Sequence, residues 1–206
     1  MSDIGLFVFP THEEVWSHNK SKLLQLNSEH PIAKLVSECR GYHSKSPDSE
    51  KAGGLQKTLF LCKSAKVMFS VNLCVPYFTG KIVDIIYLNG KRPENLLPDA
   101  VMVEFETYKG PAFIQENSKV VPIFPVDSKH DCPCNSCYRK HILLKLGWAT
   151  TIHKCQGMTI GQGEPFNYIV INPGAMSFES RNHGALLVAL SRAKSAGSDL
   201  SDADFA

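Results

Sequence analysis

One polar stretch of the chain carries residue types that bind phosphate groups. Residues 150–159 have the sequence TTIHKCQGMT. Thr151 and His153 can donate hydrogen bonds to phosphate oxygens, and Lys154 adds a positive charge. Gly157 lets the backbone approach a phosphate or a sugar closely, because glycine has no side chain. These residue types predict an anion-binding loop, although a solvated turn has the same composition.

A second stretch, residues 188–194, has the sequence VALSRAK and places Arg192 after a run of apolar residues. Residues 185–190 predict an apolar helix, whose packing would fix the direction of the arginine side chain. A rigidly held guanidinium group suits a phosphoryl group that is being transferred. The alternative is a basic helix end without a ligand, so neither stretch is specific alone.

The segments around the first stretch predict part of an open α/β sheet. Residues 142–149 are apolar and predict one buried strand that ends where the stretch begins. We expect a polar loop and the start of a helix after that strand. A strand end followed by a helix N-terminus is where such sheets bind anionic ligands. Residues 168–171 predict another buried strand.

The order and spacing of the two stretches resemble two late motifs of superfamily-one DNA helicases. In the Pif family and its Helitron-type relatives the first motif is Thr-Ile-His-Lys-Ser-Gln-Gly and the second is Val-Ala-Leu-Ser-Arg. This chain departs from the family at Cys155, where serine is usual. The resemblance covers residues 5–195, and the joint pattern is much more specific than a lone glycine motif.

The resemblance implies roles for the polar residues of both stretches. Arg192 would be the arginine finger on the γ-phosphate of ATP. Gln156 and Gly157 would lie near the nucleotide. Thr151, His153 and Lys154 would contact the DNA backbone. One loop would then touch both ligands, so that closure of the motor on ATP would shift its grip on the strand.

A segment rich in cysteines and basic residues precedes the first stretch. Cys132, Cys134 and Cys137 stand in it, with histidines on either side. Cys134 and Cys137 have the spacing of a zinc site, but Cys132 and Cys134 are too close together and a full second pair is absent. We expect a thiol-rich surface loop, with structural zinc as the alternative, and assign no metal ligand. Arg139 lies in the same loop, where it would bind the DNA backbone or form a solvated turn.

The remaining segments predict short elements. Residues 5–10 predict a strand, and Thr11 and Glu14 have the spacing of a capping box before a helix that ends near Asn27. Residues 39–54 predict a mobile linker. Further strands are predicted at 66–73, 81–87, 100–105 and 119–123, with a hairpin signal at Asn89 and Gly90. Short strands separated by turns indicate a small antiparallel barrel.

The expected fold class is α/β: an incomplete, RecA-like second motor domain of the P-loop NTPase type with an inserted small antiparallel β-barrel. The helicase family carries such a barrel in its second motor domain. The motor domain would comprise residues 1–61 and 129–206, and the barrel residues 62–128. The loop at residues 77–80 is shorter than in the family, which would mean either a strained barrel or a faulty gene model.

Two parts of an ATPase are absent from the sequence. Gly80-Lys81 and Gly90-Lys91 lack the G-x-x-x-x-G-K-[ST] pattern, and no apolar strand ends in the Asp-Glu pair that would hold Mg²⁺. In the family both lie in a first motor domain, which we expect before residue 1. ATP and Mg²⁺ are therefore expected as cofactors only together with that domain, and we expect this chain to be inactive as an ATPase alone.

The expected function is that of the C-terminal portion of an ATP-dependent 5′-to-3′ DNA helicase. It would couple ATP hydrolysis to translocation on single-stranded DNA and to duplex unwinding. The expected partners are single-stranded DNA, ATP and the first RecA-like motor domain. A non-catalytic, single-strand-binding remnant of a truncated helicase or transposon gene is the alternative. A small zinc-containing interaction protein is the third possibility.

Composition indicates the class of protein and the cellular compartment in which we expect it. The 206 residues are 43% hydrophobic and 20% charged, which is ordinary for a soluble globular chain. The formal net charge is only +2, so a nucleic-acid contact must come from a local basic patch. No apolar run could span a membrane, and residues 1–5 lack the features of a secretory signal. Seven cysteines without that signal predict reduced thiols. We expect an intracellular protein without membrane contact, nuclear or mitochondrial if eukaryotic.

Overall fold

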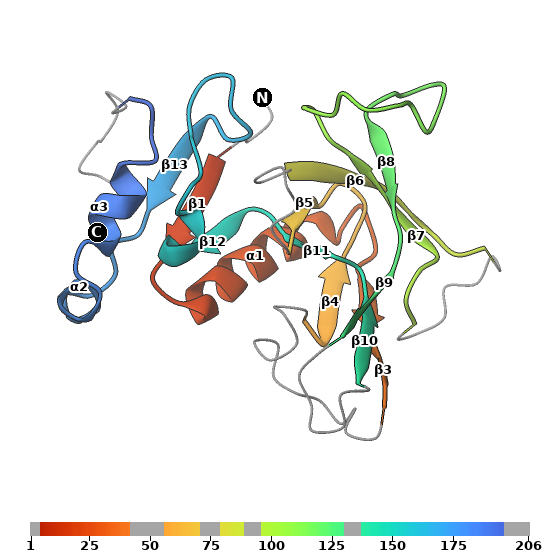
Figure 1. Cartoon of the computed structure of the whole chain (residues 1–206), viewed down its shortest axis with the longest axis horizontal. Helices are drawn as coiled ribbons and strands as arrows, with labels where there is room; N and C mark the ends of the chain where they lie inside the picture. The colour runs from red at the N-terminus through yellow and green to blue at the C-terminus, as the bar shows by residue number, and fades with distance from the viewer. Residues whose placement is uncertain (1–4, 42–55, 71–78, 89–95, 130–136, 196–206) are drawn as a thin grey trace. The chain divides into compact units, whose positions relative to one another are not determined.

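The computed structural model describes residues 5–41, 56–70, 79–88, 96–129 and 137–195 (Figure 1). The chain divides into two compact units. Unit 1 consists of Met1–Val15 and Ala149–Ala206, and unit 2 consists of Trp16–Trp148. Among the described residues, no helix is long and apolar enough to cross a membrane.

Unit 1 contains a three-stranded parallel sheet with the strand order β12-β1-β13. Its strands are β1 (Gly5–Phe9), β12 (Ala149–Thr151) and β13 (Tyr168–Ile171). β1 lies in the middle (Figure 1), and its Leu6 and Val8 are completely buried. A central strand of a parallel sheet is covered on both faces, which explains the apolar run GLFVF. The strands predicted at 5–10 and 168–171 are confirmed.

Two short helices follow β13 in unit 1, α2 (Met176–Arg181) and α3 (Ala185–Leu190). α3 coincides with the predicted apolar helix. Gly184 stands directly before α3 with a φ of 80°, a left-handed conformation that glycine adopts without strain. This glycine lets the chain turn sharply between the two helices.

Helix α1 (His12–Leu26) begins with the predicted capping box. The backbone N–H of Glu14 donates to Thr11 Oγ1 at 3.3 Å, and the backbone N–H of Thr11 donates to Glu14 Oε2 at 3.1 Å. The two bonds satisfy donors that a helix N-terminus would otherwise leave unpaired. Farther along α1, Leu23 is buried in the core of unit 2.

Unit 2 is built around a five-stranded antiparallel sheet with the strand order β11-β5-β6-β7-β8. Its strands are β5 (Lys66–Phe69), β6 (Thr79–Ile86), β7 (Ala100–Glu104), β8 (Val120–Ile123) and β11 (Leu144–Leu146). Val67, Val101 and Val103 are completely buried in its core. Each of the four strands predicted from 66 to 123 is present, within the described residues.

The described strands of this sheet do not close into the predicted barrel. β8 and β11 stand at opposite edges, and no pairing joins them in the described parts of the chain. Pro122 lies in β8 and has no N–H to donate to a further strand, so it suits an edge position. Residues 71–78, which include the first two residues of the shortened loop at 77–80, lie outside the described residues.

Two smaller sheets complete the described part of unit 2. β10 (Tyr138–His141) pairs with β3 (Glu38–Arg40) on one side and with β9 (Val126–Lys129) on the other, both antiparallel. β2 (Ala33–Val36) pairs with β4 (Thr58–Leu61).

The prediction of one strand at 142–149 is wrong. The run contributes β11 to unit 2 and β12 to unit 1, with Gly147 between them. The N–H of Gly147 donates to Lys66 O at 2.8 Å, and a Cβ at this glycine would lie 3.0 Å from the backbone of Val67. A side chain here would crowd the backbone of β5, so glycine suits the position where the chain leaves the sheet.

The predicted linker also begins too early, because Cys39 and Arg40 belong to β3. Their pairing with β10 supplies backbone hydrogen bonds that a polar sequence does not reveal. The rest of that linker, residues 42–55, lies outside the described residues. The same holds for the hairpin signal at Asn89 and Gly90, and for Cys132 and Cys134.

Candidate functional site

The first polar stretch forms a tight turn at the carboxyl end of β12. Residues Ile152–Cys155 make a 3₁₀ turn, η1, directly after Thr151. The two end residues of η1 are buried, whereas His153 and Lys154 are exposed. The ring of His153 meets the ring of Phe178 edge-on, with centroids 6.3 Å apart. η1 thus presents two adjacent side chains that can carry positive charge on the outside of unit 1.

No α-helix begins at this turn, so that expectation is wrong. η1 stops at Gln156, whose ψ of 128° is extended, and Gly157 follows with a φ of 83°. This positive φ favours glycine and turns the chain away from a helical path. The next described helix begins only at Met176. Gln156 and Gly157 are exposed in a turn, without a row of helix N–H groups behind them.

Thr151 is only 5% exposed, although it was expected to contact phosphate. It caps η1 in an extended conformation, and its side chain makes no capping hydrogen bond to the turn. A role at the DNA backbone stays a prediction for Thr151, as it does for His153 and Lys154. Of the three, the two exposed residues of η1 are the ones a strand could reach directly.

Cys155 occupies the position where the helicase motif has serine, and its thiol is structural. The Sγ atom donates to the carbonyl oxygen of Ile152 at 2.9 Å inside the turn. Burial raises the pKa of the Cys155 thiol, while the nearby Arg192 guanidinium acts in the opposite direction. The thiol and a serine hydroxyl can both donate to this carbonyl, so the departure from the motif keeps the bond that closes η1.

Arg192 follows α3 and is held by two hydrogen bonds. Its Nε donates to Val188 O at 3.1 Å, and its Nη2 donates to Ser191 Oγ at 2.8 Å. The side chain is half-buried, and α3 itself is anchored by the burial of Ala185 and Ala189. The other guanidinium N–H groups make no hydrogen bond to any residue within the described ranges. The guanidinium group is thus held through Nε and Nη2, and its remaining N–H groups can donate to a ligand.

Backbone hydrogen bonds join the two polar stretches. Ile160 forms a parallel β-bridge with Ala193. The N–H of Ile160 donates to Arg192 O at 2.9 Å, and the N–H of Lys194 donates to Ile160 O at 2.9 Å. Lys194 Nζ also pairs with Glu164 Oε1 at 2.5 Å. The sequence relates the two stretches only by their spacing, but the structure connects them. They form one connected substructure of unit 1, which includes Gln156, Gly157 and Arg192.

Glu179 is a residue of this substructure that sequence reasoning missed. Its carboxylate accepts from the N–H of Gly184 at 2.8 Å and from the N–H of Leu186 at 3.3 Å. These bonds tie α2 to the start of α3 and so help to aim the residues that follow it. The sequence gave no sign that Glu179 supports the segment carrying Arg192, because neither α2 nor the turn at Gly184 was predicted.

Arg139 does not lie on an exposed loop, so that part of the prediction is wrong. It is a residue of β10 in unit 2, and its side chain is 0% exposed. Cys137 and His141 are also buried, at the alternate positions on the same side of the strand. The role of Arg139 in DNA binding stays a prediction, and it would require the side chain to leave this buried position.

The residues of unit 1 suit the phosphates of a nucleotide better than a metal ion. A half-buried guanidinium with spare donors, next to an exposed glycine turn, fits an anionic phosphate. Within the described ranges, no group of three histidine, cysteine or carboxylate side chains could hold a metal.

Comparisons with solved structures identify the fold. Pif1 helicase from Candida albicans is similar over 93% of this chain, with a TM-score of 0.64 and 21% sequence identity. Pif1 from Bacteroides bound to single-stranded DNA gives a TM-score of 0.59 over 92% of the chain at 21% identity. Bacteroides Pif1 in complex with ADP-AlF3 and single-stranded DNA gives a TM-score of 0.60 over 94% at 20% identity.

The similarity covers only part of each helicase. This chain spans 43% of the Candida albicans protein and 38% and 39% of the two Bacteroides chains. No protein-family model matches the sequence, and no curated protein matches it. The chain is therefore a mixed α/β structure whose fold is similar to that of about two-fifths of a Pif1 helicase.

Proposed function

We propose that this chain is the C-terminal portion of an ATP-dependent DNA helicase of the Pif type. It would supply the second RecA-like motor domain and an inserted domain built on the antiparallel strands β5-β6-β7-β8. Together with a first motor domain it would couple ATP hydrolysis to 5′-to-3′ translocation on single-stranded DNA and to duplex unwinding. Arg192 would contact the γ-phosphate, Gln156 and Gly157 would lie near the nucleotide, and the exposed residues of η1 would hold the strand.

One observation supports this proposal most strongly. The stretch that resembles the DNA-contacting motif and the stretch that resembles the arginine-finger motif are hydrogen-bonded to each other through Ile160. Such a connection offers a physical route by which a change at the nucleotide could reach the residues on the strand. The fold similarity to Pif1 helicases, including complexes with ADP-AlF3 and single-stranded DNA, agrees with it.

We also propose how the chain is organised into domains, which partners it has and where in the cell it acts. We place the motor-domain segments at residues 1–61 and 129–206 and the inserted domain at 62–128. The partners would be single-stranded DNA, ATP with Mg²⁺ and a first RecA-like motor domain. The protein would act inside the cell, in the nucleus or mitochondrion of a eukaryote.

A non-catalytic single-strand-binding protein is the second candidate. It is favoured by one observation, that the 206 residues contain no G-x-x-x-x-G-K-[ST] pattern. The two candidates differ in what Arg192 does. In a helicase portion it serves ATP hydrolysis, whereas in a binding protein its loss would leave every activity of the chain unchanged.

Titration of a fluorescein-labelled oligothymidine with the purified chain tests the part common to both candidates. We expect weak binding that falls with salt, with a slope of about −0.7 per phosphate neutralised. Lys154→Ala should weaken binding and reduce the slope by about this amount. Lys20→Ala, which removes an exposed lysine of α1 in unit 2, is the matched control. A Lys154→Ala chain that binds like the wild type would remove η1 from the proposed contact.

A further inference from the structure

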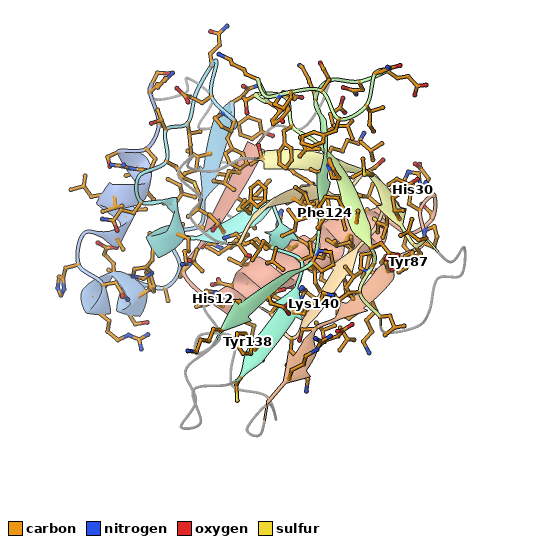
Figure 2. All side chains as sticks on the ribbon, turned by 45° about the vertical axis from the view of Figure 1, so that its right-hand side comes forward. His12, His30, Tyr87, Phe124, Tyr138 and Lys140 are labelled. Atoms are coloured by element: carbon orange, nitrogen blue, oxygen red, sulfur yellow. The ribbon has the colours of Figure 1, made fainter. Side chains whose placement is uncertain are left out.

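The small sheet β3-β10-β9 in unit 2 has one buried face and one open face. On β10, Arg139 and His141 are 0% and 1% exposed, whereas Tyr138 is 42% exposed and Lys140 is half-buried. Side chains alternate between the faces of a strand, so Tyr138 and Lys140 share the open face. Figure 2 shows both side chains extending from β10.

The pairing register places two cations beside Tyr138. Tyr138 is opposite Arg40 of β3 and opposite Lys129 of β9. Directly opposed residues of antiparallel strands lie on the same face, with Cβ atoms roughly 4.5–5.5 Å apart. Arg40 and Lys129 are both exposed. Arg40, Tyr138 and Lys129 therefore form one cross-strand row of the open face. In this row an exposed aromatic residue has a positively charged residue on each side.

The neighbouring row has the opposite character. Lys140 is opposite Glu38 of β3 and opposite Asp127 of β9, so this row holds two acidic residues and one lysine. Glu38 Oε2 also lies 3.5 Å from Arg40 Nη2, and the side chains of Arg40 and Glu38 are 68% and 40% exposed. An exposed pair of this length contributes little energy and leaves Arg40 available to another anion. Positive charge thus concentrates around Tyr138 at one end of the face.

We infer that Arg40, Tyr138 and Lys129 form a contact site for single-stranded nucleic acid. Tyr138 would stack on an unpaired base, and the two cations would contact phosphates on either side of it. Proteins hold single strands in this way, with aromatic stacking platforms between basic residues. The inference rests on the proposed function in one respect, that the ligand is the same polymer, but it uses residues of unit 2 alone.

The chemistry of the row favours a nucleic acid over an acidic peptide. An acidic peptide would satisfy Arg40 and Lys129 but would gain little from an aromatic ring between them. A nucleotide offers both a phosphate and a base, and every base has a face that can stack. Tyr138 is therefore the residue that separates the two ligands experimentally.

Titration of fluorescein-labelled oligothymidine at low salt tests the site in the complete chain. Tyr138→Ala should weaken binding about fivefold or more, since a stacked base contributes about 1–3 kcal/mol. Tyr138→Phe keeps the ring and should stay within about twofold of the wild type. Lys129→Ala should weaken binding and flatten its salt dependence. Lys140→Ala is the matched control, because this lysine of the same face is opposite two acidic residues.

Photo-crosslinking gives a direct readout of the stacked ring. An oligonucleotide that carries 5-iododeoxyuridine should crosslink to Tyr138, as mapped by mass spectrometry, and Tyr138→Ala should abolish that crosslinked peptide. Wild-type affinity in Tyr138→Ala would overturn the inference, and so would equal losses in the alanine and phenylalanine variants. Preferential binding of polyglutamate would overturn it in favour of an acidic protein partner.

The same titration separates this inference from the proposed function. Loss of binding in Tyr138→Ala with none in Lys154→Ala would support the new site and remove η1 from the strand contact. Loss in Lys154→Ala with none in Tyr138→Ala would do the reverse. Additive losses in the double variant would support both contacts, as expected for residues that share no partner.

Discussion

At the scale of single residues, Arg192 carries the sharpest prediction. In a protein that joins this chain to a phosphate-loop motor domain, Arg192→Ala should lower the DNA-stimulated ATPase rate by about 10³-fold or more. Arg192→Lys should be nearly as damaging, since an ammonium cannot reproduce the guanidinium fork. Affinity for single-stranded DNA should change little.

Arg181→Ala is a close control for this experiment. Its Nε donates to Ser177 O at 2.9 Å, four residues back, as Arg192 Nε does to Val188 O. The two arginines thus make the same local bond in the same unit, and only one belongs to the motif. If Arg192→Ala keeps more than about a tenth of the rate, a loss of under about 1.4 kcal/mol, the finger role is wrong.

His141 supports a prediction about pH. Burial lowers the pKa of His141 to about 4, and the Arg139 guanidinium adds to this, while a hydrogen bond with the backbone of Gln56 acts in the opposite direction. Its Nδ1 accepts from the N–H of Ile142, a bond that protonation of that nitrogen would break. The unfolded chain therefore binds this proton more tightly than the folded chain does.

The contribution of His141 to stability is present above about pH 6.5 and is lost as the pH falls towards 4. The free energy of unfolding should fall by up to about 3 kcal/mol across this window through His141 alone. Urea denaturation at several pH values measures it. His141→Gln should reduce the slope, with the exposed His183→Gln as control, and an unchanged slope in His141→Gln would contradict the assignment.

At the scale of elements, the turn between α2 and α3 is held by Glu179. Glu179→Ala removes both bonds to the N–H groups of Gly184 and Leu186, and the loss of such a cap costs about 0.5–2 kcal/mol. Urea denaturation should show this loss, and Glu106→Ala, an exposed glutamate of unit 2, should not. In the protein that joins this chain to a phosphate-loop motor domain, the ATPase rate should fall with Glu179→Ala while Arg192 is still present. A wild-type rate and stability would show that α3 needs no such support.

Sequence reasoning found the elements whose local signals agree with their packing. β1, β13 and α3 are apolar runs that end up buried, and the capping box at Thr11 marks the start of α1. Sequence reasoning failed where a contact between residues far apart in the sequence determines the local structure. The run at 142–149 breaks because Gly147 packs against the backbone of β5, and no feature of the run itself shows this.

The candidate site was likewise predictable only in part from the sequence. Arg192 and the residues of η1 were found from their types and spacing, and the structure connects them through Ile160. The motif gave no sign that Thr151 is buried or that Arg139 lies inside a sheet, because burial depends on strands far away in the sequence. The exposed row around Tyr138 depends on strand register, which a single sequence does not specify.

At the scale of the whole molecule, the prediction concerns catalysis by the chain alone. The 206 residues should not hydrolyse ATP at a helicase-like rate, even with single-stranded DNA present. The phosphate loop and the Mg²⁺ carboxylates supply most of the charge stabilisation in phosphoryl transfer, and the sequence has neither pattern. Phosphate release measured with purified protein checks this. DNA-stimulated turnover of a few per second, abolished by Arg192→Ala, would refute it.

The parallel sheet of unit 1 pairs strands that the ribosome synthesises at widely separated times. Phe7 of β1 pairs with Ala149 of β12, and its other neighbour, Val170, is synthesised later still. At roughly 5–20 residues per second, the ribosome needs on the order of 10 s to deliver β12 after β1 has emerged. All of Trp16–Trp148 leaves the ribosome during that interval, and its strands can pair among themselves. During that interval the apolar strand β1 lacks the two strands with which it pairs in the finished sheet, so we expect the nascent chain to be more prone to aggregation than the finished protein.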